Sequence, residues 1–185
     1  MILTLDRVYT YYRETESFWY TCRMTLTTHA VVGAAVVSML PQHPVLGVCL
    51  AFASHFAIDA IPHWDYPIAS ASINPLMGSS MKYDKSLILD ATRIGADALT
   101  GVSLAVLFFA SPQTLTPIVL GACAGILPDP LQFVYTRFRR EPLVSLQLFH
   151  QWIHTKNYMK NAVFLGVSTQ LIFIATIVIA VKVLR

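Results

Sequence analysis

The sequence predicts an all-α membrane protein, a polytopic helix bundle with about five transmembrane helices. Hydrophobic residues make up 55% of the 185 residues, whereas charged residues make up only 12%. A soluble domain carries roughly 25% charged residues, so charge is depleted about twofold. The charged residues gather in a few connections and leave long apolar runs between them. Several of these runs approach the roughly 20 apolar residues that a helix needs to cross a bilayer.

The chain is expected to begin with a polar and aromatic extension at residues 1–23, followed by one membrane-embedded helical domain at residues 24–185. The extension lacks the apolar core of a signal peptide. The five predicted spans cover residues 26–40, 44–62, 87–110, 114–127 and 161–184. The first and fourth are short, which is typical of tilted or partly inserted helices, and the fifth has a charge-free apolar core.

Cationic residues predict the orientation of the bundle. The connections after the first and third spans carry no Lys or Arg. The cations gather after the second and fourth spans, at Lys82, Lys85, Arg137, Arg139, Arg140, Lys156 and Lys160. Because cytoplasmic loops are enriched in Lys and Arg, the N-terminus is expected in the cytoplasm, with the chain integral to a bacterial inner membrane. The net charge of +3 and the absence of dense basic runs argue against nucleic acid as a partner.

The third predicted span contains three ionisable residues, Asp90, Arg93 and Asp97. Ionisable side chains in a membrane helix face the interior of the bundle and indicate function. Asp90 and Arg93 are three residues apart, so an internal ion pair is the alternative for them. Asp97 lies deeper and is the stronger candidate ligand.

Metal-ligand residue types gather toward one membrane face. Five of the six histidines fall at the same end of the predicted helices, together with several aspartates. His43 lies in a turn at the opposite face and is excluded. The candidate metal ligands are His29, His55, Asp59, Asp97, Asp129, His150 and His154. His63 lies at the same end, and is either a further site residue or the end of a helix with aromatic neighbours.

Two pairs of these residues have a spacing that suits metal binding, His55-x3-Asp59 and His150-x3-His154. Residues at i and i+4 share a helix face, with Cβ atoms about 5–6 Å apart, so two such side chains can hold one ion. Mixed imidazole and carboxylate ligands suit zinc, and also manganese or iron. The alternatives are a polar pair that joins two helices for the first, and an interfacial amphipathic helix for the second.

The chain also contains a faint internal repeat of two helical hairpins. Aligning the segment that starts at His29 with the one that starts at Asp97 also aligns His63 with Asp129. A symmetric pair of hairpins would bring these four residues together at one end. Within the second hairpin, Gly121-x3-Gly125 predicts close helix packing.

Three short motifs between residues 25 and 157 resemble the LexA-regulated (YdjM-like) membrane-bound metal-dependent hydrolases. They are Thr28-His29-x3-Gly33, Gly125-Ile-Leu-Pro128-Asp129 and His150-Gln-Trp-Ile-His154-Thr155. The third is similar to that family's HRxxHS signature, with Gln151 replacing arginine and Thr155 replacing serine. The resemblance implies a multi-pass hydrolase with these histidines and aspartates as metal ligands. Arg93 or Lys156 would then substitute for the missing arginine in binding phosphate.

A second, weaker likeness is to zinc-dependent phospholipase C and the related nucleases. Their helices carry an HFxxD motif followed by proline and histidine, similar to His55-Phe56-x2-Asp59-x2-Pro62-His63. This likeness implies zinc and a phosphoester substrate.

The sequence therefore predicts a hydrolase that uses one or two divalent ions, most simply zinc, to cleave a phosphoester of a lipid or another membrane-associated substrate at the cytoplasmic face. A membrane lipid is the expected substrate because the site would lie at headgroup depth. The expected catalytic residues are Asp90 as general base, Arg93 as phosphate ligand, and His63. The alternatives are a cation transporter or channel that uses buried Asp and His, and a structural membrane protein whose polar residues join helices.

Overall fold

The computed structural model describes residues 22–23, 25–64, 66–72, 80–154 and 162–184, and is mostly helical within these ranges. The helices are α2 (Leu26–Ser38), α3 (Pro44–Asp59), α4 (Lys85–Phe109), α5 (Leu115–Ile126), α6 (Pro128–Arg137), α7 (Leu143–Ile153) and α8 (Val163–Leu184). Short strands β1 (Cys22–Arg23) and β2 (Tyr66–Pro67) pair antiparallel, as do β3 (Ala71–Ser72) and β4 (Ser80–Met81). The predicted extension lies outside the described residues, apart from the two residues of β1.

Local sequence explains several helix starts. Pro44 and Pro128 occupy the first turns of α3 and α6, where proline has the required φ and no amide hydrogen is needed. Asp84 caps α4, because its carboxylate accepts a hydrogen bond from the Ser86 amide at 2.8 Å. These stops and starts divide the apolar sequence into separate helices.

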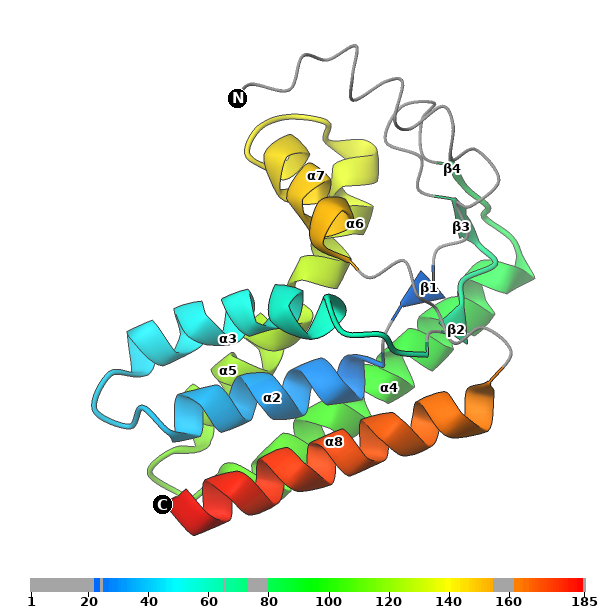
Figure 1. Ribbon diagram of the computed structural model, residues 1–185. Helices are drawn as coiled ribbons and strands as arrows, with labels where there is room; N and C mark the ends of the chain where they lie inside the picture. Colours follow the sequence, from blue (N-terminus) through cyan, green and yellow to red (C-terminus); the bar gives the residue numbers. More distant parts are fainter. Residues whose placement is uncertain (1–21, 24, 65, 73–79, 155–161, 185) are drawn as a thin grey trace.

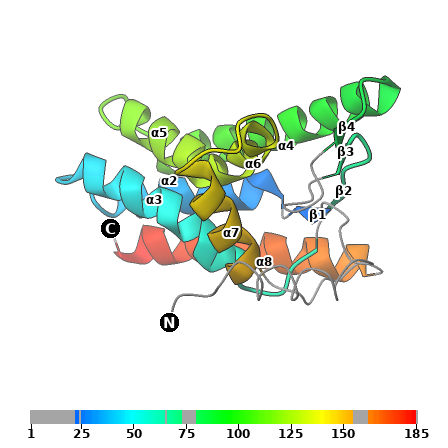
Figure 2. The same cartoon turned by 90° about the horizontal axis from the view of Figure 1, so that it is seen from above.

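Helix α2 is the centre of the bundle. It buries eleven of its thirteen residues and contacts α3, α4, α5 and α8. Figure 1 shows α2 between α3 and α8, and Figure 2 shows α4 and α5 on one side of α2 with α8 on the other. A histidine on such a central helix is shielded from solvent, and His29 is fully buried.

Glycines bring the backbones of α2 and α5 into direct contact. A Cβ atom at Gly33 would overlap the carbonyl oxygen of Gly121, and one at Gly125 would overlap the carbonyl oxygen of His29. The close packing predicted from Gly121-x3-Gly125 is therefore confirmed. It also places α5 directly beside His29.

The prediction of about five membrane spans is not supported. Only α4 and α8 are long and apolar enough to cross a membrane among the described residues, and α5 with α6, bent by 48°, would make a third. Helices α2 and α3 have 13 and 16 residues. At a rise of 1.5 Å per residue they extend about 20 and 24 Å, short of the roughly 30 Å hydrocarbon layer. The structure therefore supports a helical protein with two or three membrane-capable segments, which agrees with a membrane location.

Candidate metal centre

Five separate segments deliver side chains to one buried cluster. These are the first turn of α2, the last turns of α3, the turn after α3, the first turn of α6, and the end of α7. The residues brought together are His29, His55, Asp59, His63, Asp129, His150 and His154. All of them are buried except His154, whose side chain is 15% exposed. Six of the seven predicted ligands thus lie together with His63, whereas the seventh, Asp97, lies elsewhere.

Asp59 lies at the centre of the cluster. Its Oδ1 atom is 3.2 Å from His29 Nε2. Its Oδ2 atom is 3.1 Å from His55 Nε2 and 2.7 Å from His150 Nε2. The Nε2 atom of His154 lies 4.0 Å from the same oxygen. One buried carboxylate therefore faces imidazoles from three helices and a helix end.

One ring nitrogen of His55 forms a hydrogen bond outside the cluster, and this bond determines which nitrogen faces the cluster. His55 Nδ1 lies 2.8 Å from the Gly125 carbonyl oxygen, which only accepts hydrogen bonds, so Nδ1 is the donor. In the neutral ring, Nε2 then presents a lone pair. That lone pair faces Asp59 at 3.1 Å and the Asp129 carboxylate at 3.8 Å. Acceptors that face one another in a dry site repel each other unless a proton or a metal cation lies between them.

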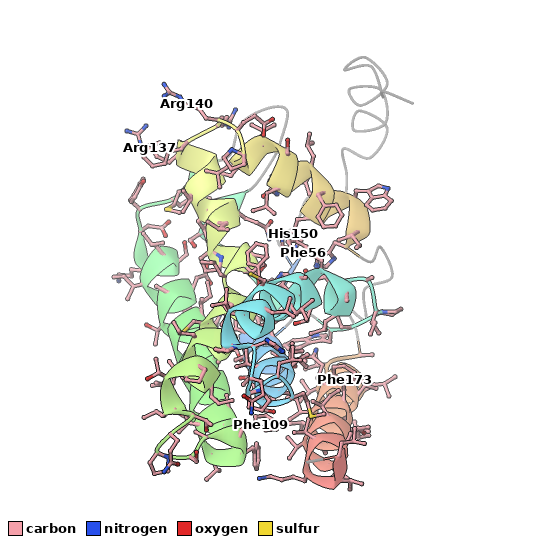
Figure 3. The ribbon with its side chains drawn as sticks, turned by 90° about the vertical axis from the view of Figure 1, so that its left-hand side faces the viewer. Phe56, Phe109, Arg137, Arg140, His150 and Phe173 are labelled. Carbon is pink, nitrogen blue, oxygen red and sulfur yellow. The ribbon has the colours of Figure 1, made fainter. Side chains whose placement is uncertain are left out.

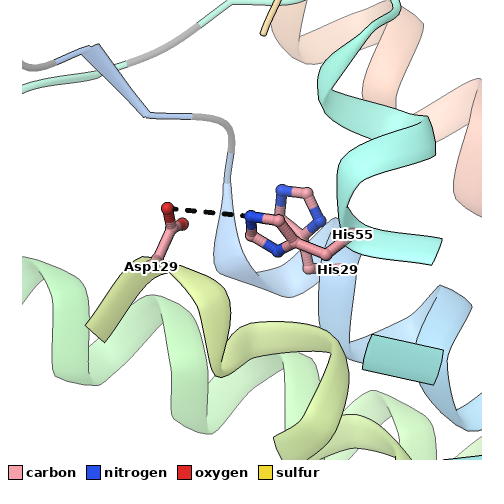
Figure 4. Close-up of side chains that lie close together, drawn as sticks. All are labelled: His29, His55 and Asp129. Carbon is pink, nitrogen blue, oxygen red and sulfur yellow. Dashed lines mark ion pairs between the residues drawn. The ribbon is translucent and has the colours of Figure 1, made fainter. Parts of the chain in front are cut away.

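His29 has the surroundings of a ligand. Its ring stacks on that of His55, with centroids 4.0 Å apart, and the Asp129 carboxylate faces a nitrogen at the edge of the His55 ring (Figure 4). Neither ring nitrogen of His29 meets hydrogen-bond geometry with any described residue, although Nε2 lies 3.2 Å from Asp59 Oδ1. Buried polar atoms nearly always have partners, so this buried imidazole could accept a further ligand.

The distances between donor atoms also fit a metal ion. A tetrahedral ion with bonds of about 2.0–2.1 Å holds its ligand atoms roughly 3.3 Å apart. The separations of 3.2 Å between His29 and Asp59, and of 3.4 Å between the Nε2 atoms of His55 and His150, are close to this value, whereas the 2.7 Å between His150 and Asp59 is a hydrogen-bond distance. Three overlapping groups have ligand atoms within 4.8 Å of one another: His29, His55 and Asp129; His55, Asp59 and His150; and Asp59, His63 and His154. The donor set thus fits one or two divalent cations.

Burial favours the coordinating form of His150. It lowers the pKa of this imidazole below its ordinary value, although the hydrogen bond to Asp59 acts in the opposite direction. A lowered pKa keeps the ring neutral near pH 7, and neutral imidazole is the form that binds metals. Phe56 packs against His150, with ring centroids 5.3 Å apart, and holds α7 against α3 (Figure 3).

His63 and His154 extend the cluster toward the end of α7. Their rings meet edge to face, with centroids 5.1 Å apart. His63 Nδ1 donates a hydrogen bond to the Ile61 carbonyl oxygen at 2.6 Å, which leaves Nε2 as its basic nitrogen. His63 thus belongs to the site, and its catalytic role stays a prediction.

Two glutamines orient Asp129, and the sequence reasoning missed both. Gln132 Nε2 donates to Asp129 Oδ1 at 3.0 Å, and Gln147 Nε2 donates to Gln132 Oε1 at 3.3 Å. Gln132 follows Asp129 by three residues and Gln147 precedes His150 by three, so each shares a helix face with a ligand-type residue. This three-residue spacing was the signal in the sequence that could have identified both glutamines. Asp129 also lies in the first turn of α6, where the helix dipole stabilises a carboxylate.

The structure places Asp97 outside the cluster. Its carboxylate accepts hydrogen bonds from the backbone amides of Leu26 and Thr27 at 2.6 and 3.1 Å, and from the Tyr66 hydroxyl at 3.2 Å. The residue at the N-cap of α2, Thr25, provides no side-chain cap. Asp97 supplies one from α4 instead, because the first amides of a helix have no partner within the helix. The internal repeat predicted Asp97 beside His29 as a ligand, and the structure uses it as a cap.

The structure also places Asp90 and Arg93 elsewhere. Asp90 accepts hydrogen bonds from the Ala69 and Ser70 amides at 2.8 and 2.7 Å, which ties the β2–β3 connection to α4. Arg93, with a side chain 54% exposed, lies 3.9 Å from Asp90, as the ion-pair alternative anticipated. Lys156 and Thr155 lie outside the described residues.

The chain has no match among family models, curated proteins or solved structures. The resemblance to the YdjM-like hydrolases therefore stays a prediction, and the case for a function depends on the geometry of this cluster.

Proposed function

We propose that this protein is a membrane-embedded, metal-dependent hydrolase that cleaves a phosphoester of a lipid or membrane-associated substrate. The site would bind one or two divalent ions, with zinc preferred and manganese or iron as alternatives. We place it at the cytoplasmic face of a bacterial inner membrane, because the cationic connections lie on the same side of the chain as the ligand residues.

The observation that carries the proposal is the convergence of imidazole nitrogens and carboxylate oxygens around Asp59. The Nε2 atom of His55 lies 3.1 Å from the Asp59 carboxylate and 3.8 Å from the Asp129 carboxylate, with almost no solvent contact. His29 adds an imidazole without a hydrogen bond. A single proton would satisfy only one pair of these atoms, whereas a divalent ion would satisfy several at once.

Each residue has a role in this proposal. His29, His55, Asp59, Asp129, His150 and His154 would hold the metal. When bound, a divalent ion supplies a Lewis acid and lowers the pKa of water toward neutrality. His63 is proposed as the general base, because its hydrogen bond to Ile61 directs the basic nitrogen toward the Asp59–His154 side of the cluster. Asp90 and Arg93 have structural contacts and are not assigned catalytic roles.

Metal content tests the site directly. Full-length protein purified in detergent is expected to contain about one or two equivalents of metal by elemental analysis, directly or after incubation with zinc. His150→Ala and Asp59→Ala are expected to lose it, because each removes a central donor. His43→Ala is the matched control, since His43 is exposed at the opposite end of α3. Equal metal content in all four proteins, with equal helicity by circular dichroism, would exclude the site.

Hydrolysis separates an enzyme from a transporter. Detergent-solubilised protein, which has no sealed compartment, is expected to release headgroup or phosphate from a panel of phospholipids. A chelator should abolish the release, and zinc should restore it. The same assay with His63→Gln is expected to show reduced turnover with metal content retained. Turnover that is unchanged in chelator would contradict metal-dependent hydrolysis.

A further inference from the structure

Helix α7 has the reverse of the burial pattern expected in water. Its polar residues Gln147 and His150 are buried, at 3% and 2% exposure. Its aromatic residues Phe149 and Trp152 are exposed, at 42% and 76%. The buried face is explained by the metal centre. The exposed face needs an apolar neighbour, because two large aromatic side chains on one face are unfavourable in water.

The direction of α7 relative to the membrane-capable helices indicates the nature of that apolar neighbour. Helices α4 and α8 are the membrane-capable helices, and they run in roughly the same direction in Figure 1. Helix α7 lies on one side of the bundle and crosses that direction steeply (Figure 1), whereas α6 continues α5 after a bend of 48°. If α4 and α8 cross the bilayer, α7 lies along its plane, which is how interfacial helices lie. Tryptophan is enriched at this depth because it joins an apolar ring to a polar N–H group.

A group of three arginines lies at the other end of the same hairpin. Arg137 is in the last turn of α6, Arg139 and Arg140 are in the connection to α7, and all three are exposed. Figure 3 shows Arg137 and Arg140 at the end of the hairpin away from His150. Glu141 is the acidic residue of this connection, and its carboxylate accepts hydrogen bonds from the Ser145 amide and hydroxyl at the start of α7. No ion pair joins the three arginines to any described carboxylate. Planar guanidinium groups pair with phosphate oxygens in a bidentate manner.

We propose that the α6–α7 hairpin is a lipid-docking element that binds the anionic phosphate headgroups of one leaflet through Arg137, Arg139 and Arg140, and inserts Phe149 and Trp152 into that leaflet. The occupant of this surface is the lipid bilayer, since exposed aromatic rings and unpaired cations together complement an anionic membrane surface. The inference rests on the membrane-capable helices and the exposed face of α7, and it is independent of the proposed hydrolase activity.

The fluorescence of Trp152 reports this docking. The variant Trp19→Phe/Trp64→Phe retains Trp152 alone and is reconstituted, full length, at one copy per lipid nanodisc. Lipids brominated near the headgroup end of the acyl chain are expected to quench Trp152, and aqueous acrylamide is expected to quench it less than in detergent. Adding phosphatidylglycerol to phosphatidylcholine nanodiscs should increase this protection, because the anionic lipid pairs with the arginines.

Charge-neutral variants test the role of the arginines. In the same background, Arg137→Gln/Arg139→Gln/Arg140→Gln is expected to lose the dependence on phosphatidylglycerol. The matched control, Lys82→Gln/Lys85→Gln/Arg93→Gln, removes the same charge from exposed positions just before and within the first turns of α4, and should retain the dependence on phosphatidylglycerol. Trp152 that is open to acrylamide and unaffected by brominated lipid would overturn the proposal. Protection that appears only at two copies per nanodisc would also overturn it, because it would assign the surface to a second copy of the chain.

Discussion

At the scale of single residues, the centre depends on how Asp59 is compensated. A carboxylate that is 2% exposed is costly to bury unless positive charge or hydrogen bonds surround it. His150 lies 2.7 Å from Asp59, and His29 and His55 lie 3.2 and 3.1 Å from it. A structural role for Asp59 would need donors on these rings. The Gly125 carbonyl commits the proton of neutral His55 to the far side of the ring, which favours a cation at the centre.

Gln132 provides a test of the surroundings of the ligands. Gln132→Met keeps the length of the side chain but removes its hydrogen bonds to Asp129 and Gln147. We expect metal affinity to fall about 10- to 100-fold, the usual effect of losing a group that orients a ligand. Competition with a chromogenic zinc chelator measures the affinity.

The control for this variant is Gln113→Met, in the exposed α4–α5 connection. This control variant should bind metal with the same affinity as the wild-type protein. If Gln132→Met also binds normally, Asp129 needs no orientation by α6, and its place as a ligand is in doubt.

At the scale of helices, the predicted i, i+4 pairs do share one face. His55 and Asp59 lie 3.1 Å apart on α3, and the rings of His150 and His154 stack with centroids 5.9 Å apart. Such pairs follow from helical periodicity alone. Their convergence follows from packing, because α2 and α5 approach closely at Gly33, Gly121 and Gly125.

Gly125 permits the close approach of α2 and α5, and its carbonyl oxygen accepts a hydrogen bond from His55. Gly125→Ala tests both roles. The added methyl group would overlap the His29 carbonyl oxygen, while the Gly125 carbonyl holds His55. We expect the variant to lose about 1–3 kcal/mol of stability, the usual cost of overpacking, together with part of its metal affinity. Thermal unfolding in detergent and chelator competition measure the two effects.

Gly95→Ala is the matched control for this substitution. Gly95 lies in α4, and a Cβ atom there would meet nothing within 4 Å. Its melting temperature should be unchanged or slightly higher, because alanine favours a helix. Equal melting temperatures for the two variants would show that α2 and α5 can move apart without loss of stability.

At the scale of the whole molecule, the long helix α8 fixes the turn that carries His63. Gln170, buried on α8, donates a hydrogen bond to the Trp64 carbonyl at 2.7 Å. Gly166 allows the close approach, since a Cβ atom there would overlap Trp64. The membrane-capable helix thus supports the site as well as anchoring the chain.

The sequence by itself determined the helical class, the membrane character and the ligand types, because composition and helical periodicity are local properties of the chain. It could not determine the number of spans, since the ends of α2 and α3 depend on how α4, α5 and α8 pack around them. Nor could it distinguish Asp97 from Asp129, since both are aspartates in apolar surroundings toward the same predicted face. Tertiary structure decided between them: the free amides at the start of α2 bind Asp97, whereas Asp129 enters the cluster from the first turn of α6. Whether a carboxylate becomes a helix cap or a candidate metal ligand depends on which unpaired polar groups lie beside it once the helices have packed.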